Sequence, residues 1–120
     1  MEHFSSPRWF SLHDYYPSFH MLLLRSRPLT AADQNVIDII FRGVFYVELR
    51  SDLDGVMISE ASDEEAAQLD KRADLSQRYE ANRYFVLTSR EQRYRVGAHL
   101  YYVEENNLTR LRLRPTSCRE

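Results

Sequence analysis

The sequence predicts an α+β fold, predominantly antiparallel β, with one acidic helix near residues 62–80. Three observations predict it. Apolar and polar residues alternate over several short stretches, which is typical of half-buried strands. The connections between these stretches are short, which favours antiparallel neighbours. Residues 62–80 alone change to a helical pattern. We therefore expect six or seven strands, arranged as a sandwich or a partly open barrel.

The chain begins with a stretch that is rich in aromatic side chains but irregular. Pro7 and Pro17 oppose regular structure in their neighbourhood. We expect residues 1–17 to form an aromatic N-terminal arm that docks on the body, because exposing so many aromatic side chains would be unfavourable. Residues 18–115 are then a single β-rich domain, and 116–120 a tail.

The first half of the domain contains four apolar stretches with strand character, 19–25, 35–41, 44–50 and 56–59. Alternation is clearest in 44–50. Between the last two stretches, Asp54-Gly55 is the strongest turn signal in the chain, since this dipeptide readily adopts positive φ. The sequence therefore predicts a hairpin across Asp54-Gly55.

Residues 62–80 have the signals of a helix. Ser62 followed by Glu65 is a capping-box pattern, and acidic residues in the first turn with basic residues later suit the helix dipole. Ala66 and Leu69 lie at helical spacing, but the apolar stripe is thin, so we expect an exposed helix. A mobile acidic loop is the alternative.

The strand pattern resumes at Arg83, with stretches at 83–89, 94–102 and 108–114 and polar turns at 90–93 and 105–107. In 94–102, the even-numbered residues are expected to share a core face. In 108–114, Leu111 and Leu113 are expected to face the core, because strand side chains alternate with period two.

The charges are segregated along the chain, although the net charge is only −2. Residues 48–82 carry ten acids and four bases, and residues 83–120 carry four acids and eight arginines. If the two segments touch, they neutralise each other within the fold. If they occupy separate faces, each attracts a charged partner. The sequence leaves both arrangements open.

Motifs of catalysis and metal binding are not evident. The histidines are scattered, and Cys118 lies near the chain end, where a thiol is rarely held well enough to act as a nucleophile. No nucleotide-binding glycine motif occurs, and no apolar run reaches membrane-spanning length. We expect a non-enzymatic protein without cofactor or metal, not bound to a membrane and, without a secretory signal, cytoplasmic.

Two stretches carry a resemblance: FRGVFYVELRSDLDGVMISEAS and RYFVLTSREQRYRVGAHLYYVEEN. Their glycine–valine–aromatic step, turn and later strand hairpin resemble small uncharacterised bacterial proteins, some of which are similar to immunity proteins of bacterial toxin systems. The resemblance covers about half the chain and rests on hydrophobic and glycine positions. It implies a bacterial, immunity-like protein and transfers no functional residue.

Arginine and tyrosine side chains interleave in the C-terminal third. The candidate partner-binding residues are Arg93, Arg95, Tyr101, Arg110, Arg112 and Arg114. Such residues anchor protein partners or hold phosphates and stack on bases, and they can also form a solvent face paired with the acidic helix.

These residues give a functional hypothesis with one alternative. We expect a bacterial protein-interaction module that binds a partner protein through a charged and aromatic face. A nucleic-acid-binding module that uses the arginine and tyrosine face is the alternative, although a pI near 6.1 is low for one. Exposed strand edges also make a homodimer a reasonable expectation.

Overall fold

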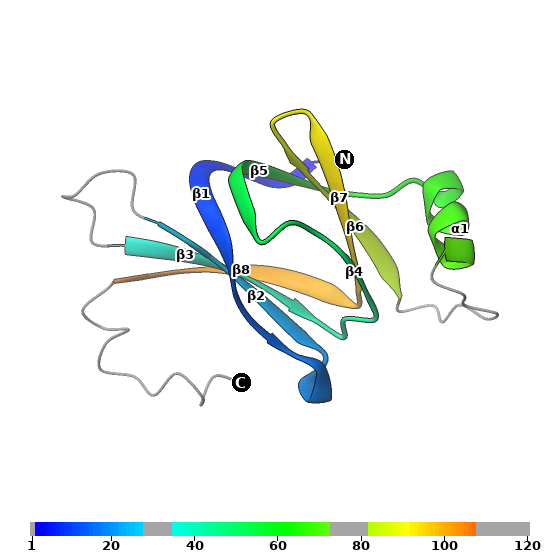
Figure 1. Cartoon of the computed structure of the whole chain (residues 1–120), viewed down its shortest axis with the longest axis horizontal. Coiled ribbons are helices and arrows are strands. Elements are labelled where there is room, and N and C mark those ends of the chain that lie inside the picture. The colour runs from blue at the N-terminus through cyan, green and yellow to red at the C-terminus, as the bar shows by residue number, and fades with distance from the viewer. Residues whose placement is uncertain (1, 28–34, 73–81, 108–120) are drawn as a thin grey trace.

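The computed structural model describes residues 2–27, 35–72 and 82–107, which form eight strands, a short 3-10 helix and one α-helix (Figure 1). The elements in chain order are β1 (Glu2–Tyr16), η1 (Pro17–Phe19), β2 (Met21–Ser26), β3 (Asn35–Arg42), β4 (Tyr46–Glu48), β5 (Asp52–Glu60), α1 (Asp63–Arg72), β6 (Arg83–Ser89), β7 (Gln92–Ala98) and β8 (Leu100–Asn107). All neighbouring strands are antiparallel.

The eight strands form one open sheet in the order β4-β7-β6-β5-β1-β2-β3-β8. The predicted α+β class with an antiparallel sheet is therefore confirmed. The expected number of six or seven strands is wrong, and the described strands make a single sheet rather than the two layers of a sandwich. The difference arises at β1, which has no strand pattern in the sequence, and at His99, where one expected strand is divided into two.

The sheet curls strongly, so that its two ends meet at one corner. Only residues 43–45 separate β3 from β4, and only His99 separates β7 from β8. Hydrogen bonds from the Phe45 amide to the Gly97 carbonyl (2.9 Å) and from the His99 amide to the Arg42 carbonyl (2.9 Å) hold this corner. The curl turns one face of the sheet inward and buries it.

The inner face carries the main hydrophobic core. It is formed by Phe10, Leu22, Leu24, Ile39, Phe41, Val44, Leu53, Val56, Ile58, Phe85, Leu87, Val96 and Ala98, from β1, β2, β3, β5, β6 and β7 and the β3–β4 connection. A smaller cluster of Met21, Leu23 and Ile40 lies on the other side of β2 and β3. Burial of both faces explains why Met21-Leu22-Leu23-Leu24 is an unbroken apolar run instead of an alternating one.

The first residues differ from the expected arm. Glu2–Tyr16 form β1, which lies between β5 and β2 near the middle of the sheet. Its register shifts between Ser6 and Trp9, where Pro7 stands, and again between Leu12 and Asp14. These irregularities accommodate the proline and interrupt the alternation of apolar and polar residues. The sequence pattern of a strand is therefore not visible here.

The predicted hairpin across Asp54-Gly55 is wrong. Both residues lie inside β5, which pairs with β1 and β6, whereas β4 pairs with β7. Gly55 adopts φ +79°, and its Cα faces the backbone of Ser6 and Pro7, where the register of β1 shifts. Its positive φ therefore belongs to an irregular position in the pairing of β5 with β1, and the chain does not reverse there.

The expected strand 94–102 is divided at His99, and its pattern changes there. Val96 and Ala98 are in the core, but Leu100 and Tyr102 are exposed, so the expected core face is wrong beyond Ala98. The close approach of the two strand ends explains the break. A Cβ on Gly97 would lie 2.7 Å from the Phe45 ring, so a larger residue at this crossing would have to displace that ring.

The β6–β7 hairpin reverses through Arg90 and Glu91, which adopt φ 49° and 69°. L-residues are disfavoured in this region by roughly 1–2 kcal/mol. We expect Glu91→Gly to raise the free energy of unfolding by about 0.5–1 kcal/mol, measured by urea denaturation. Glu60→Gly, on the extended β5, should lower it by a similar amount. The same sign for both variants would contradict this assignment of strain.

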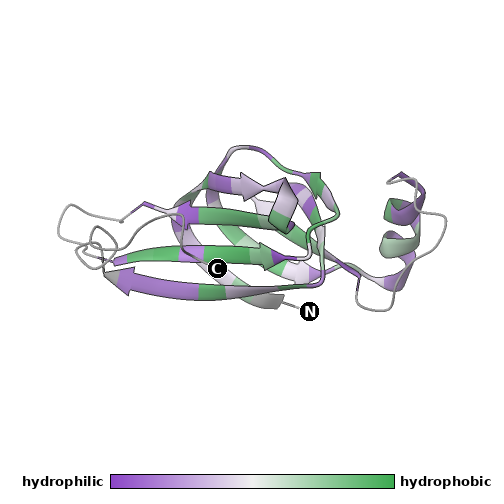
Figure 2. Cartoon of the chain, turned by 90° about the horizontal axis from the view of Figure 1, so that it is seen from below, coloured by the Kyte–Doolittle hydropathy of each residue, from purple (hydrophilic) through white to green (hydrophobic). Residues whose placement is uncertain are grey.

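The acidic helix is confirmed over Asp63–Arg72, and residues 73–81 lie outside the described part of the chain. The Ser62 hydroxyl accepts a hydrogen bond from the Glu65 amide (3.1 Å), as the capping-box pattern predicts. Ala66 and Leu69 pack on Tyr84 of β6, and the helix stands beyond one end of the sheet (Figure 1; Figure 2).

Two further predictions concern the end of the chain. The turn at 105–107 is wrong, since β8 continues through these residues to Asn107, paired with β3. The strand 108–114, with Leu111 and Leu113, and the tail 116–120 lie outside the described residues. Among those described, no helix has both the length and the apolar character needed to cross a membrane.

Candidate binding site beside strand β8

The structure separates the predicted partner-binding residues into two places. Arg93 and Arg95 lie on β7 and face α1, whereas Tyr101 lies on the inner side of β8. Arg110, Arg112 and Arg114 lie outside the described residues. The described residues therefore offer two different surfaces for binding.

Arg93 and Arg95 belong to a network of alternating charges between α1, β4 and β7. Glu65 of α1 accepts hydrogen bonds from Arg93 Nη2 (3.0 Å) and Arg95 Nε (3.1 Å). Glu48 of β4 accepts one from Arg72 Nη1 (2.7 Å), and its second oxygen lies 3.6 Å from Arg95 Nη1. The network joins both strands to the helix.

This network decides which of the two charge arrangements applies to these residues. The acids of the network come from the acidic segment and two of its arginines from the basic segment, and Arg90 pairs with Asp54 in the same way. The two segments therefore neutralise each other over this part of the fold. Arg93 and Arg95 would have to break internal ion pairs to bind a phosphate or an acidic partner.

Glu65 is the centre of the network. Burial would raise the pKa of its carboxyl, but the hydrogen bonds and charges of Arg93 and Arg95 outweigh burial and hold the pKa below its usual 4.5. A carboxyl whose pKa is lowered on folding stabilises the folded state above the unfolded pKa. That contribution is lost as the pH falls through the lowered folded pKa.

We expect Glu65→Gln to lower the free energy of unfolding by about 1 kcal/mol at neutral pH, since it weakens two partly exposed ion pairs. The deficit should shrink at high salt and below pH 4.5, in denaturant titrations at several pH values. Glu64→Gln is the matched control, because Glu64 is exposed and forms no ion pair with a described residue. A deficit for Glu65→Gln that stays constant with pH would refute the electrostatic role.

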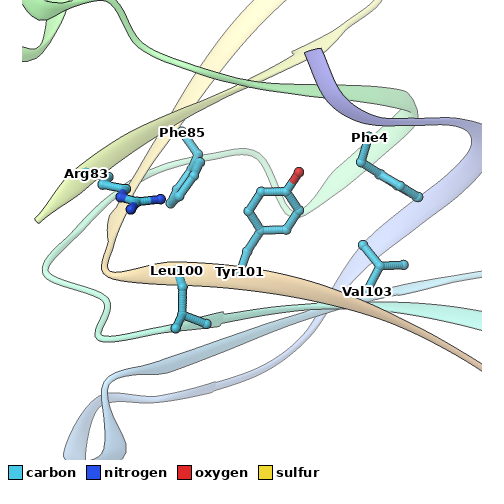
Figure 3. Close-up of a pocket in the computed structure, with 6 residues that line it drawn as sticks. All are labelled: Phe4, Arg83, Phe85, Leu100, Tyr101 and Val103. Carbon is cyan, nitrogen blue, oxygen red and sulfur yellow. The ribbon is translucent and has the colours of Figure 1, made fainter. Parts of the chain in front are cut away.

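The second surface is a cleft of about 440 Å³ on the inner side of the sheet, where β8 passes the beginnings of β6 and β1. Phe4, Arg83, Phe85, Leu100, Tyr101 and Val103 line it. Figure 3 shows Arg83 near one end, Val103 and Phe4 near the other, and Tyr101 standing between them. The volume lies within the usual range of ligand pockets.

Tyr101 forms the centre of the cleft wall and is fixed by the core. Its ring lies 5.1 Å from the ring of Phe85, nearly perpendicular to it, and 5.6 Å from that of Phe41. Burial raises the pKa of its phenol above the usual 10.0. The side chain therefore presents a rigid aromatic wall whose hydroxyl stays protonated at neutral pH.

Arg83 provides the charge of the cleft. Its side chain is exposed at the start of β6, beside the turn into β8, and it forms no ion pair or hydrogen bond with a described residue. This sets it apart from Arg93 and Arg95. A guanidinium without an internal partner can bind an anionic group without first breaking an ion pair.

The cleft borders an edge of β8 with which no described strand pairs. Within the described residues β8 pairs with β3 alone and is the last strand of the sheet. Its other edge presents backbone N–H and C=O groups that a further strand can use. Val103, 36% exposed, lies on this strand with its side chain in the cleft (Figure 3).

Sequence reasoning found Tyr101 but missed Phe4, Arg83 and Val103. Phe4 was assigned to the arm, and Arg83 appeared only as the first residue of a strand. Val103 was missed because the reversal of side-chain direction at His99 has no local signal. The one available sign was the pair Tyr101 and Val103 at period two, which marks one face of a strand.

The described residues contain no group of three or more histidine, cysteine, aspartate or glutamate side chains that could hold a metal ion. Comparisons with protein-family models, with curated proteins and with solved structures found no match.

Proposed function

We propose that the protein is a non-enzymatic protein-binding module and that its partner binds in the cleft beside β8. The observation that carries the proposal is the combination, in one place, of an aromatic cleft, an arginine that has no partner among the described residues and a strand edge that no described strand pairs with. Aromatic and arginine side chains are the residues that most often dominate binding energy at protein interfaces.

The character of the cleft supports recognition rather than catalysis. Among the described residues that line it, the polar side chains are the guanidinium of Arg83 and the phenol of Tyr101, and none is a carboxylate or an imidazole. The immunity-like resemblance suggests a bacterial toxin as the class of partner and the cytoplasm as the setting. Both belong to this proposal.

The alternative function, nucleic-acid binding, has weaker support. It relied on the arginines of the C-terminal third, and Arg93 and Arg95 are engaged in ion pairs with Glu65 and Glu48. A titration of labelled single strands distinguishes the two functions. Nucleic-acid binding requires an affinity that falls steeply with salt, as counterions are displaced from phosphates.

Two valine substitutions test the proposed site. Val103→Glu places a charge in the cleft, and Val47→Glu is the matched control on β4, where the side chain is exposed to a similar degree (40%). The purified chain and both variants are immobilised and treated with an extract of the source organism. We expect one protein to be retained by the wild type and by Val47→Glu and to be lost with Val103→Glu.

Equal retention by all three proteins would place the interface elsewhere, and retention of nothing above background would contradict protein binding. Circular dichroism of both variants verifies that they fold. Each substitution replaces a partly exposed side chain outside the main core, so both should melt close to the wild type.

A further inference from the structure

The side chains that β8 presents along the cleft form an ordered series of charge and apolarity. Tyr101, Val103 and Glu105 follow each other at period two, so they share one side of the strand. Arg83 stands beside the Leu100 end of this row. The series therefore runs from a cation, through an apolar centre, to an anion.

The anionic end of this row, Glu105, is exposed and forms few hydrogen bonds with the described residues. Among the described residues, only Asn35 donates a hydrogen bond to Glu105, from Nδ2 (3.2 Å). Glu104, its neighbour, is also exposed. A cationic side chain from a partner can approach this end without displacing an ion pair between described residues.

From this series we infer that the partner segment is an extended strand that adds to β8 in antiparallel orientation, with the pattern basic–x–apolar–x–acidic from its N-terminus. The inference rests on the proposed function and specifies the chemistry of the partner. The basic residue lies opposite Glu105, the large apolar residue enters the cleft at Val103 and Tyr101, and the acidic residue meets Arg83.

The antiparallel direction follows the rest of the sheet, in which every strand pair is antiparallel. Strand addition supplies backbone hydrogen bonds for affinity, while alternate side chains supply specificity. Opposite charges that face each other across two strands are stabilising, and like charges are destabilising. The order of the charges in the segment is thus the feature that selects the partner.

A second copy of this chain satisfies the pattern only in part. Its own β8, placed antiparallel on the same edge, would bring Glu105 to Arg83 and Val103 to the cleft. It would offer Tyr101 rather than a basic residue to Glu105. The occupant is therefore a different protein, and self-association is the alternative that the test distinguishes.

The test uses two blocked peptides of identical composition, Thr-Lys-Thr-Phe-Thr-Glu-Thr and its charge-exchanged form Thr-Glu-Thr-Phe-Thr-Lys-Thr. Threonine favours extended backbone. Binding to the full-length chain is followed through its amide NMR signals at peptide concentrations up to about 1 mM. We expect the first peptide to shift β8 signals saturably and to bind about tenfold more tightly than the second.

The variant Arg83→Glu should bind the first peptide more weakly than the wild type does and the second peptide more tightly. Arg50→Glu replaces an exposed arginine between β4 and β5, and it should change the affinity for neither peptide. Equal affinity for both peptides, or no shift for either, would overturn the inference. A dimer in light scattering that Val103→Glu dissociates would also overturn it, in favour of a second copy.

Failure of this inference and failure of the proposed function are distinguishable. If an extract protein is lost with Val103→Glu while neither peptide binds, the cleft is an interface, but its partner is not a strand of this pattern. If the peptide binds in the expected order, the strand chemistry holds whether or not a partner has been captured.

Discussion

Truncation of Phe41 to alanine should lower the free energy of unfolding by about 3–5 kcal/mol, the usual loss for emptying a buried phenylalanine site. Phe41 is completely buried. Its ring lies 6.1 Å from that of Phe85 and 5.6 Å from that of Tyr101, so it supports the aromatic wall of the cleft from below. The loss is a large part of the total stability of a domain of this size.

Urea denaturation of Phe41→Ala measures this effect, and Phe19→Ala is its matched control. Phe19 is 72% exposed, and its truncation should change stability by less than about 0.5 kcal/mol. Similar losses in the two variants would mean that the inner face of the curled sheet is not the principal core. Because Phe41 lies behind Tyr101, we expect Phe41→Ala to weaken partner binding as well as to lower the free energy of unfolding.

Replacement of Arg25 by methionine should lower the free energy of unfolding by about 3–5 kcal/mol, because it leaves a buried carboxylate without its partner. Asp38 is almost fully buried, with 4% of its side chain exposed. Both of its oxygens accept hydrogen bonds from Arg25, from Nε (2.7 Å) and Nη2 (3.0 Å). The contact with Asp38 also raises the pKa of Arg25 above its usual value.

The double variant Arg25→Met/Asp38→Leu separates the ion pair from side-chain packing. It removes both charges, and apolar replacements of buried pairs are often neutral or stabilising. We therefore expect it to recover most of the stability that the single variant loses in thermal or urea denaturation. A double variant as unstable as Arg25→Met alone would show that the loss comes from packing rather than from the unpaired carboxylate.

The sequence predicted those elements whose structure is determined by residues close to them in the chain. The capping box and the placement of charges predicted α1, the strand pattern that resumes at Arg83 predicted β6, and alternation predicted most of β7. The Arg90–Glu91 reversal was predicted as a polar turn, although its residues are unusual at positive φ. In these elements local preference and tertiary structure agree.

The remaining features depend on contacts between residues far apart in sequence. β1 is a strand because β5 and β2 pair with it on either side, despite Pro7. Gly55 lies against the register shift of β1, which is nearly fifty residues away in sequence. Without this contact, the dipeptide Asp54-Gly55 is a signal for a turn. Such preferences are overridden by tertiary contacts, which a single sequence does not display.

The site was predictable only in part for the same reason. Tyr101 was identified as a candidate binding residue from its neighbourhood of arginines, yet the cleft that it lines also needs Phe4 and Arg83, which are distant in the chain. The charge of Arg93 and Arg95 was visible in the sequence. Their engagement by Glu65 and Glu48 became visible only once α1 and β4 were placed beside β7.

The proposed interface is the cleft beside β8, in which a partner protein binds. The dissociation constant of the captured partner, measured by calorimetry with the wild type, Val103→Glu and Val47→Glu, tests it most directly. We expect Val103→Glu to raise the constant about 30-fold or more, as for a residue at the centre of an interface, and Val47→Glu to leave it within about twofold. Equal constants for the three proteins, or a larger effect of Val47→Glu, would contradict this assignment.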